Sequence, residues 1–247
     1  MTRIFYLAIA ISCYAAFFVS FVYFVGFVGA CPGFPMTVDK GIASGRVTAA
    51  LIDLALIALF GLQHSIMARP KFKAMWTRIV PIALERSIYC LAAALALGVM
   101  FVFWHPISGM VWHIANPIGR TIIWTLFWLG FGLVFISTWL INHFELFGLA
   151  QVWRNLRGNV PVDTIFRTPL FYRLVRHPIY SGFTLAIWAT PDMSVGHVLF
   201  AAGMTLYILI GIAHEEKDLI AYFGEQYVQY RARVGMLVPW LGRRQSR

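Results

Sequence analysis

Four long apolar stretches dominate this sequence and restrict it to folds that a lipid bilayer can hold. Ile4–Ala30, Ser87–Trp104 and Thr121–Phe144 contain no Asp, Glu, Lys or Arg. The remaining stretch, Val47–Ala68, contains only Asp53. Each can cross a hydrocarbon layer of about 30 Å as a helix, which rises about 1.5 Å per residue. Hydrophobic residues make up 60% of the chain and charged residues 12%, which is not the balance of a soluble domain. The sequence therefore predicts an all-α integral membrane protein with four full spans.

Two further apolar runs follow, His177–Thr190 and Ser194–Ala213, and Pro191-Asp192 separates them. Proline disfavours helix in the residue before it, and a carboxylate at mid-depth in a bilayer is costly. We therefore expect a C-terminal helical hairpin that turns at this dipeptide. Its first arm is shorter than a full crossing requires. An amphipathic helix is expected to follow within Glu215–Trp240.

Lys and Arg are distributed unequally between the two sides of the predicted spans. Only Lys40, Arg46 and Arg120 of the 20 basic residues fall on the less basic side, and the net charge is +10. Cytoplasmic loops carry an excess of Lys and Arg, so we expect both termini and the open end of the hairpin in the cytoplasm, most simply of a bacterial inner membrane. The basic residues then face the lipid bilayer. Nucleic-acid binding is not expected, because it would require them on a soluble fold.

The chain is expected to form a single domain, because no repeat, low-complexity tract or linker divides it. Within that domain, residues 1–145 form the four-helix membrane part. Residues 146–247 contain a polar loop, the hairpin and the C-terminal amphipathic helix. Loop, hairpin and tail together could enclose a pocket at the cytoplasmic membrane surface.

The N-terminal stretch and the cysteines indicate neither processing nor disulfides. The first apolar stretch is about twice as long as a signal-peptide core, which favours an uncleaved span. Val28-Gly29-Ala30-Cys31 nevertheless loosely resembles a lipoprotein cleavage box. Cys13 and Cys90 lie in predicted spans and Cys31 has no extracytoplasmic partner, so no disulfide is expected.

Polar residues gather at the open end of the predicted hairpin. Arg176-His177-Pro178-Ile179-Tyr180-Ser181-Gly182 begins the first arm, and Glu215-Glu216-Lys217-Asp218-Leu219 follows the second. Phe223-Gly224-Glu225-Gln226-Tyr227-Val228-Gln229-Tyr230 comes shortly after. Taken singly, such residues are common anchors of helix ends at the membrane interface. As an ordered set of costly groups they indicate a functional site.

These segments, in this order and spacing, resemble the isoprenylcysteine carboxyl methyltransferase superfamily of membrane S-adenosylmethionine-dependent methyltransferases. The resemblance covers residues 164–239. Three upstream segments are similar to the branch that contains methanethiol S-methyltransferases and NnrU-like membrane proteins. They are Gly61–Arg69, Glu85–Tyr89 and Asn142–Leu149.

The resemblance implies a binding site for S-adenosylmethionine. In the superfamily, the His-Pro-x-Tyr segment, the first Glu of the pair and the stretch upstream contact this cofactor. A carboxylate at that Glu can accept hydrogen bonds from the ribose diol or pair with the ammonium, and an aromatic ring can border the sulfonium. The positions implied here are Gln151, Thr164, Ile165, Phe166, Arg167, Tyr172, His177, Pro178, Ile179, Tyr180 and Glu215.

A small thiol is the expected methyl acceptor. The carboxyl methyltransferases use an Arg four residues before the cofactor-binding Glu to engage a carboxylate substrate, and this chain has Gly211 there. The leading hypothesis is therefore methylation of methanethiol, with hydrogen sulfide as a further acceptor. The alternatives are an isoprenoid, lipid or carboxylate acceptor, and a non-enzymatic NnrU-like accessory role.

A thiol with a pKa near the cysteine value of about 8.5 is mostly protonated at neutral pH, so the site should remove its proton or stabilise the thiolate. The polar residues near the cytoplasmic ends of the spans are candidates for this role. Arg86 can equally pair with Glu85 or Glu145, and the histidines can be ordinary interfacial residues. No metal site is expected, because the histidines lack a ligand spacing. The candidates are His64, Arg86, His143 and His214. The oligomeric state stays open.

Overall fold

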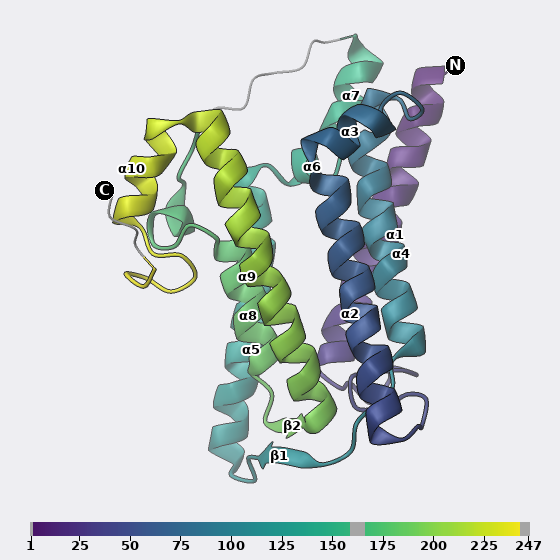
Figure 1. Ribbon diagram of the computed structural model, residues 1–247, viewed down its shortest axis with the longest axis vertical. Coiled ribbons are helices and arrows are strands. Elements are labelled where there is room, and N and C mark those ends of the chain that lie inside the picture. The colour runs from purple at the N-terminus through teal and green to yellow at the C-terminus, as the bar shows by residue number, and fades with distance from the viewer. Residues whose placement is uncertain (1, 159–165, 243–247) are drawn as a thin grey trace. The chain divides into compact units, whose positions relative to one another are not determined.

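The computed structural model describes residues 2–158 and 166–242, and nearly all of its elements are helices (Figure 1). In chain order the elements are α1 (Thr2–Val28), α2 (Arg46–Ala68), α3 (Pro70–Trp76), the 3-10 turn η1 (Ile82–Leu84), α4 (Glu85–Phe103), β1 (Met110–His113), α5 (Pro117–Ile141), α6 (His143–Leu146), α7 (Leu149–Arg157), the 3-10 turn η2 (Leu170–Arg173), α8 (Pro178–Trp188), β2 (Asp192–Ser194), α9 (Val195–Phe223) and α10 (Glu225–Arg233).

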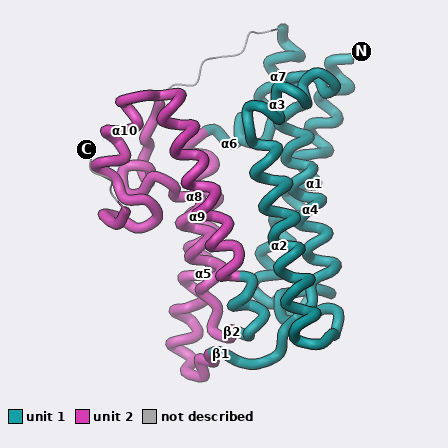
Figure 2. The backbone as a smooth tube through the Cα atoms, in the orientation of Figure 1, with its two compact units in different colours: residues 1–111, 142–163, 194–200 teal, residues 112–141, 164–193, 201–247 magenta. Residues whose placement is uncertain are grey.

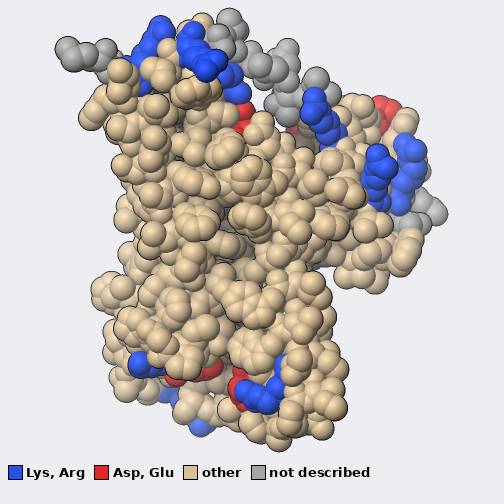
Figure 3. Space-filling view, turned by 180° about the vertical axis from the view of Figure 1, so that it is seen from behind, with Lys and Arg blue, Asp and Glu red and all other residues tan. Residues whose placement is uncertain are grey.

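The chain divides into two compact units, shown in different colours in Figure 2. Unit 1 contains Met1–Val111, Asn142–Asp163 and Ser194–Phe200. Unit 2 contains Trp112–Ile141, Thr164–Met193 and Ala201–Arg247. On the face shown in Figure 3, Lys and Arg appear near the top and bottom of the view, and the surface between them is almost entirely uncharged.

Five helices in the described part of the chain are long and apolar enough to cross a membrane. They are α1, α2, α4 together with η1, α5 and α9. The first four lie where the apolar stretches predicted spans, and α9 contains the second arm of the predicted hairpin. Large apolar side chains such as Phe5, Leu51 and Trp128 are exposed on these helices, as contact with lipid requires. The prediction of a helical integral membrane protein is confirmed.

In unit 1, α4 packs against α1 and α2 around an aromatic core. The fully buried ring of Phe27 lies 5.1 Å from that of Phe101 and 5.8 Å, edge-on, from that of Trp104. Asp53 is also fully buried, and it accepts the backbone N–H of His105 at 2.9 Å. This acidic residue therefore fixes the chain just after α4.

In unit 2, α8 packs closely along α5 because two glycines meet. A Cβ atom on Gly130 would lie 2.7 Å from the carbonyl oxygen of Gly182. A Cβ atom on Gly182 would lie 2.5 Å from the carbonyl oxygen of Gly130. Small residues let helix backbones approach closely in membranes, so this contact holds the first arm of the hairpin against α5. The arm has 11 residues and is short, as the sequence predicted.

The turn of the hairpin is held by an ion pair within unit 2. The carboxylate of Asp192 lies 2.8 Å from Nη2 of Arg120 and 2.5 Å from Nδ1 of His113. The hydrogen bond from Arg120 holds the pKa of the Asp192 carboxyl below its ordinary value. Trp112 donates its indole N–H to the carbonyl of Thr190 at 2.9 Å. The turn is therefore tied both to the start of α5 and to the strand before it.

The predicted amphipathic helix within Glu215–Trp240 is wrong in its boundaries. The helix of the second arm does not stop before Glu215 but continues to Phe223. The break falls at Gly224, whose φ of +58° is a conformation that other residues rarely adopt, and α10 covers only Glu225–Arg233. The fourth predicted span also ends earlier, at Ile141. The sequence analysis did not predict α3, α7 or the two-stranded sheet of β1 and β2, all of which are short elements.

Candidate functional site

A buried ion pair in unit 2 joins the segment before α8 to α9. Nε of Arg176 donates to Oε1 of Glu216 at 2.7 Å, and the two side chains are 1% and 5% exposed. Nη1 of Arg231 lies 3.9 Å from the other oxygen of the same carboxylate. Charges that are removed from water persist only when they are paired. The Glu216 carboxylate is therefore the electrostatic centre of this region.

Arg176 also binds the C-terminal segment. Its Nη1 donates to the carbonyl of Val234 at 2.5 Å. The backbone N–H groups of Arg176 and His177 donate to the carbonyls of Gly235 and Met236 at 2.8 and 3.2 Å. The residues just before α8 are thus held, through backbone and side-chain hydrogen bonds, by residues that follow α10. This arrangement fixes His177 at the start of α8.

The accessible carboxylate of this region belongs to Glu215, which lies beside the buried His177. Nε2 of the buried His177 lies 3.3 Å from Oε1 of Glu216, and Nδ1 lies 3.9 Å from Oε2 of Glu215. Because an ionised carboxylate only accepts hydrogen bonds, we assign an imidazole proton to Nε2, which faces Glu216. In the neutral ring Nδ1 is then a hydrogen-bond acceptor. The side chain of Glu215 is 43% exposed, so its carboxylate is available to a ligand.

Aromatic residues surround this pair. Tyr230 donates its hydroxyl to the carbonyl of Tyr172 at 2.5 Å. The ring of Phe166 lies 5.3 Å from that of Tyr230 and 6.0 Å from that of Tyr227, edge-on to both. Burial, and then the charge of Glu215, raise the pKa of Tyr172, so its phenol stays protonated at neutral pH. The region therefore offers ring faces beside a carboxylate.

Most of the cofactor positions implied by the sequence lie together in unit 2. The ring centroids of His177 and Tyr180 are 5.7 Å apart, with the first residues of α8 between them. The residues in this group are Phe166, Tyr172, His177, Pro178, Ile179, Tyr180 and Glu215.

Of the remaining implied cofactor positions, Arg167 follows Phe166 in sequence and is exposed. Gln151 lies on α7 of unit 1, where its amide nitrogen donates to the carbonyl of Glu145 at 3.0 Å. Thr164 and Ile165 lie outside the described residues.

Three of the four candidate thiol helpers gather in unit 1. The ring of His64 on α2 lies 4.9 Å from that of Tyr89 on α4, and the guanidinium of Arg86 lies 4.9 Å from the same ring. The ring of His143 lies 4.8 Å from that of Phe147, which belongs to the same buried cluster as Tyr89. Side chains from three helices are thus collected around one aromatic cluster.

Arg86 is a cation without a carboxylate partner among the described residues. Its Nε donates to the carbonyl of Leu146 at 2.7 Å. The alternative of an ion pair with Glu145 is not found, because that carboxylate makes two hydrogen bonds of 2.6 Å to Arg154. Glu85, the other alternative, makes no ion pair with Arg86 in the described ranges either. A half-buried cation without a counter-ion favours an anionic ligand.

The two other candidate histidines, His143 and His214, differ from His64 in their surroundings. Nε2 of His143 lies 2.8 Å from the hydroxyl of Tyr14, and burial lowers the pKa of His143, so the ring is neutral at pH 7. His214 lies in unit 2, exposed on α9, and its Nδ1 is 2.9 Å from the carbonyl of Ile210 in the same helix. Within the described ranges, no three His, Cys, Asp or Glu side chains are placed to hold a metal ion.

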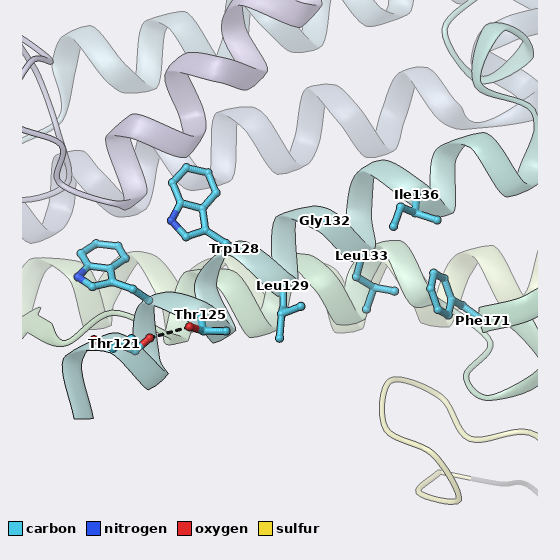
Figure 4. A pocket seen from close by; sticks show the side chains of 9 residues that line it. Thr121, Thr125, Trp128, Leu129, Gly132, Leu133, Ile136 and Phe171 are labelled. Carbon is cyan, nitrogen blue, oxygen red and sulfur yellow. Dashed lines mark hydrogen bonds between the residues drawn. The ribbon is translucent and has the colours of Figure 1, made fainter. Parts of the chain in front are cut away.

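Unit 2 also contains an apolar groove along α5, shown in Figure 4. The hydroxyl of Thr125 donates to the carbonyl of Thr121 at 2.8 Å, and the hydroxyl of Thr121 to that of Pro117 at 3.0 Å. These polar groups are therefore already satisfied within the helix. None of the implied site residues lines the groove, so it is not part of the candidate site. The lining residues are Thr121, Trp124, Thr125, Trp128, Leu129, Gly132, Leu133, Ile136 and Phe171.

Sequence reasoning gave no site role to Glu216, Arg231 or Tyr14. Adjacent residues of a helix point about 100° apart, so only one carboxylate of the Glu215-Glu216 pair can face Arg176. The sequence alone does not say which one does. Tyr14 lies in an apolar span and had no signal that pointed to His143.

Comparison with known proteins gives close relatives over most of the chain. The methanethiol S-methyltransferase of Pseudomonas deceptionensis is 51% identical over 85% of this chain and 80% of its own length. That of Crocosphaera subtropica is 46% identical over 99% of this chain and 95% of its own length. That of Mycobacterium tuberculosis is 48% identical over 92% of this chain and 93% of its own length. No family model and no solved structure matches.

Proposed function

The chain belongs to the methanethiol S-methyltransferase family, and we propose that it transfers the methyl group of S-adenosylmethionine to methanethiol. The observation that carries this proposal is the identity of 46–51% with such enzymes over nearly the whole chain. The cofactor supplies an electrophilic methyl group on a sulfonium. A thiolate sulfur bonds to that methyl carbon as the old carbon–sulfur bond breaks, which yields dimethyl sulfide and S-adenosylhomocysteine. The thiol proton leaves to a base or to solvent.

The cofactor site is proposed around the start of α8 and the turn of α9 that carries Glu215. The residues present suit S-adenosylmethionine, whose ammonium and ribose hydroxyls are hydrogen-bond donors. The exposed carboxylate of Glu215 and Nδ1 of His177 are acceptors 3.9 Å apart. The rings of Tyr172 and Tyr180 add faces that attract a cation. The proposed set in unit 2 also includes Phe166, Arg167, Pro178 and Ile179, together with Thr164 and Ile165, which lie outside the described residues. Gln151, in unit 1, is the remaining proposed position.

Arg86 is the first choice for the group that makes the thiol nucleophilic. Its uncompensated charge stabilises a thiolate and so lowers the pKa of a bound thiol. His64 lies beside the same Tyr89 ring and is the proposed proton acceptor. His143 is a weaker candidate because the hydroxyl of Tyr14 already occupies its Nε2. His214, exposed and close to its own helix backbone, comes last.

The choice of a small, uncharged acceptor rests on Gly211. It lies one turn before Glu215 on α9, and a Cβ atom there would meet no atom within 4 Å. A side chain at this position therefore has open space around its Cβ atom, and Gly211 itself supplies no cation to a carboxylate. Methanethiol, and hydrogen sulfide as a second acceptor, need no such partner. Both are small and partition readily into the apolar surroundings of a membrane site.

The orientation proposed from charge places both termini and the cofactor residues in the cytoplasm. In unit 2, Arg173, Arg176 and Arg231 lie with the cofactor residues, while Arg120 lies at the hairpin turn. We also propose that residues 1–247 act as one domain. Fusion of a reporter that is active only in the cytoplasm to the C-terminus tests the orientation.

Dimethyl sulfide in the headspace of cells that express this chain and receive methanethiol tests the function. We expect production above that of cells with an empty vector, and loss of this excess in Glu215→Ala. Methylation of an isoprenoid, lipid or carboxylate acceptor in place of methanethiol would contradict the proposal and favour a different methyltransferase. Absence of methyl transfer to every acceptor would favour the accessory role.

A further inference from the structure

Tyr227 and Tyr230 lie three residues apart on α10, but their hydroxyl groups have different surroundings. The hydroxyl of Tyr230 donates to the carbonyl of Tyr172. Tyr227 is 2% exposed, and its hydroxyl has no hydrogen-bond partner among the residues that the structure describes. Burying a hydroxyl without a partner destabilises a fold, so such a group points to a missing ligand.

Arg231 carries a second donor of this kind, one helical turn further along. Its Nε is buried and has no acceptor in the described part of the chain. Its Nη1 is 3.9 Å from Glu216, beyond the length of a hydrogen bond. Residues four apart lie on one face of a helix, about 5–6 Å from each other at Cβ. Tyr227 and Arg231 therefore lie on the same face of α10, and each carries a buried donor without an acceptor among the described residues.

Both groups are hydrogen-bond donors at neutral pH. A guanidinium has no acceptor atom. Burial, and then the charge of Glu216, raise the pKa of Tyr227, so its phenol keeps the proton. Glu216 does not satisfy them, because its Oε1 already accepts from Arg176 and lies 3.3 Å from Nε2 of His177. Two donors without an acceptor on one helix face fit a ligand group that only accepts, such as a carboxylate.

We infer that Tyr227 and Arg231 bind the carboxylate of the methionyl part of S-adenosylmethionine. The inference rests on the proposed function, which makes this molecule the ligand of the region. It gives α10 a binding role beside the acceptors Glu215 and His177. The two charged ends of the amino-acid moiety then meet groups of opposite charge, with Glu215 available to the ammonium and Arg231 to the carboxylate.

The test compares S-adenosylmethionine with its decarboxylated analogue, S-adenosylmethioninamine, by calorimetric titration of the purified full chain. We expect wild type to bind S-adenosylmethionine about tenfold or more tightly than the analogue, as loss of a charged hydrogen bond implies. Tyr227→Phe should lose most of this preference and keep the wild-type affinity for the analogue. Its thermal midpoint without ligand should equal or exceed that of wild type, because no internal hydrogen bond is lost.

Tyr230→Phe is the matched control on the same helix. It removes a hydroxyl that has an internal partner, so it should lower the thermal midpoint and keep the preference for the carboxylate. Arg231→Met, which preserves the length of the side chain, gives a second and independent test. It should reduce the preference as Tyr227→Phe does.

Two outcomes would overturn the inference while the proposed function stands. In the first, Tyr227→Phe and Arg231→Met both keep the wild-type preference for S-adenosylmethionine over the analogue. The other is an equal loss of affinity for both ligands, which would mean that these side chains do not contact the carboxylate. A wild-type chain that binds neither ligand would instead refute the proposed function, and the inference with it.

Discussion

Nε2 of His177 lies 3.3 Å from Oε1 of Glu216, the same oxygen that accepts a hydrogen bond from Arg176. One buried carboxylate thus holds a structural cation and sets the orientation of an imidazole at once. The side chain of the preceding residue, Glu215, is 43% exposed and makes no contact with Arg176 among the described interactions. Two adjacent acidic residues of one helix therefore differ in their surroundings, because one carboxylate is buried in an ion pair and the other is open to solvent.

The Glu215-Glu216 pair gives the first prediction. Glu216→Gln leaves the buried Arg176 without its counter-ion, and breaking a buried ion pair in this way costs about 3–5 kcal/mol. Glu215→Gln should leave thermal stability near that of wild type and weaken S-adenosylmethionine binding. Thermal unfolding in detergent and calorimetric titration separate the two effects. Equal destabilisation by the two substitutions would contradict the assigned roles.

The contact between α5 and α8 gives a second prediction. Gly130→Ala places a methyl group 2.7 Å from the carbonyl oxygen of Gly182, and overpacking of this kind costs about 1–3 kcal/mol. Gly132 lies on the same helix beside the groove of Figure 4, and a Cβ atom there meets nothing within 4 Å. Gly132→Ala is therefore the matched control and should not lower the thermal midpoint. A similar loss in both variants would indicate a general effect of glycine rather than this contact.

The spans were predictable because hydropathy is a local property of the sequence. Their observed ends lie close to those expected, for example Ile4–Ala30 against Thr2–Val28. The end of α9 was not predictable in the same way. Glu215 and Glu216 suggested that the apolar helix had stopped, but the buried Arg176 neutralises Glu216 and the helix continues to Phe223. That compensation comes from a residue 40 positions away in sequence.

The site was predictable only in part, and through family resemblance. The ordered motifs implied a cofactor role for His177 and Glu215, and the structure brings these two side chains to within 3.9 Å of each other. They did not reveal that the hydroxyl of Tyr227 is buried without a partner, because this depends on what packs around α10. They also did not reveal the contact between Tyr14 and His143, because these two residues are 129 positions apart in the sequence.

The unpaired charge of Arg86 gives a third prediction, on the pH dependence of turnover. Arg86→Met should lower kcat at neutral pH, because the variant no longer stabilises the thiolate. Activity should recover as pH rises toward the thiol pKa, near or above about 8.5, where thiolate forms in solution. Arg86→Lys, which keeps the charge, should retain part of the neutral-pH rate. Steady-state rates across this pH range are the measurement, and an unchanged pH–rate profile in Arg86→Met would place thiolate stabilisation at another residue.

Gly211 gives a fourth prediction, on acceptor choice. Wild type should form little methyl ester on a farnesylcysteine analogue in comparison with its rate on methanethiol. Gly211→Arg should raise the rate on the carboxylate, because the position has room for a side chain. Gly211→Ala fills the position without a charge and should keep the wild-type preference. Efficient ester formation by wild type would contradict the thiol assignment.

Transfer of an isotopically labelled methyl group tests the central claim most directly. Purified protein in lipid nanodiscs receives methanethiol and S-adenosylmethionine with a trideuterated methyl group, and the headspace is read by gas chromatography with mass spectrometry. The proposed reaction predicts trideuterated dimethyl sulfide in amounts that match the S-adenosylhomocysteine formed. Formation of S-adenosylhomocysteine without labelled dimethyl sulfide, or no consumption of the labelled cofactor at all, would contradict it.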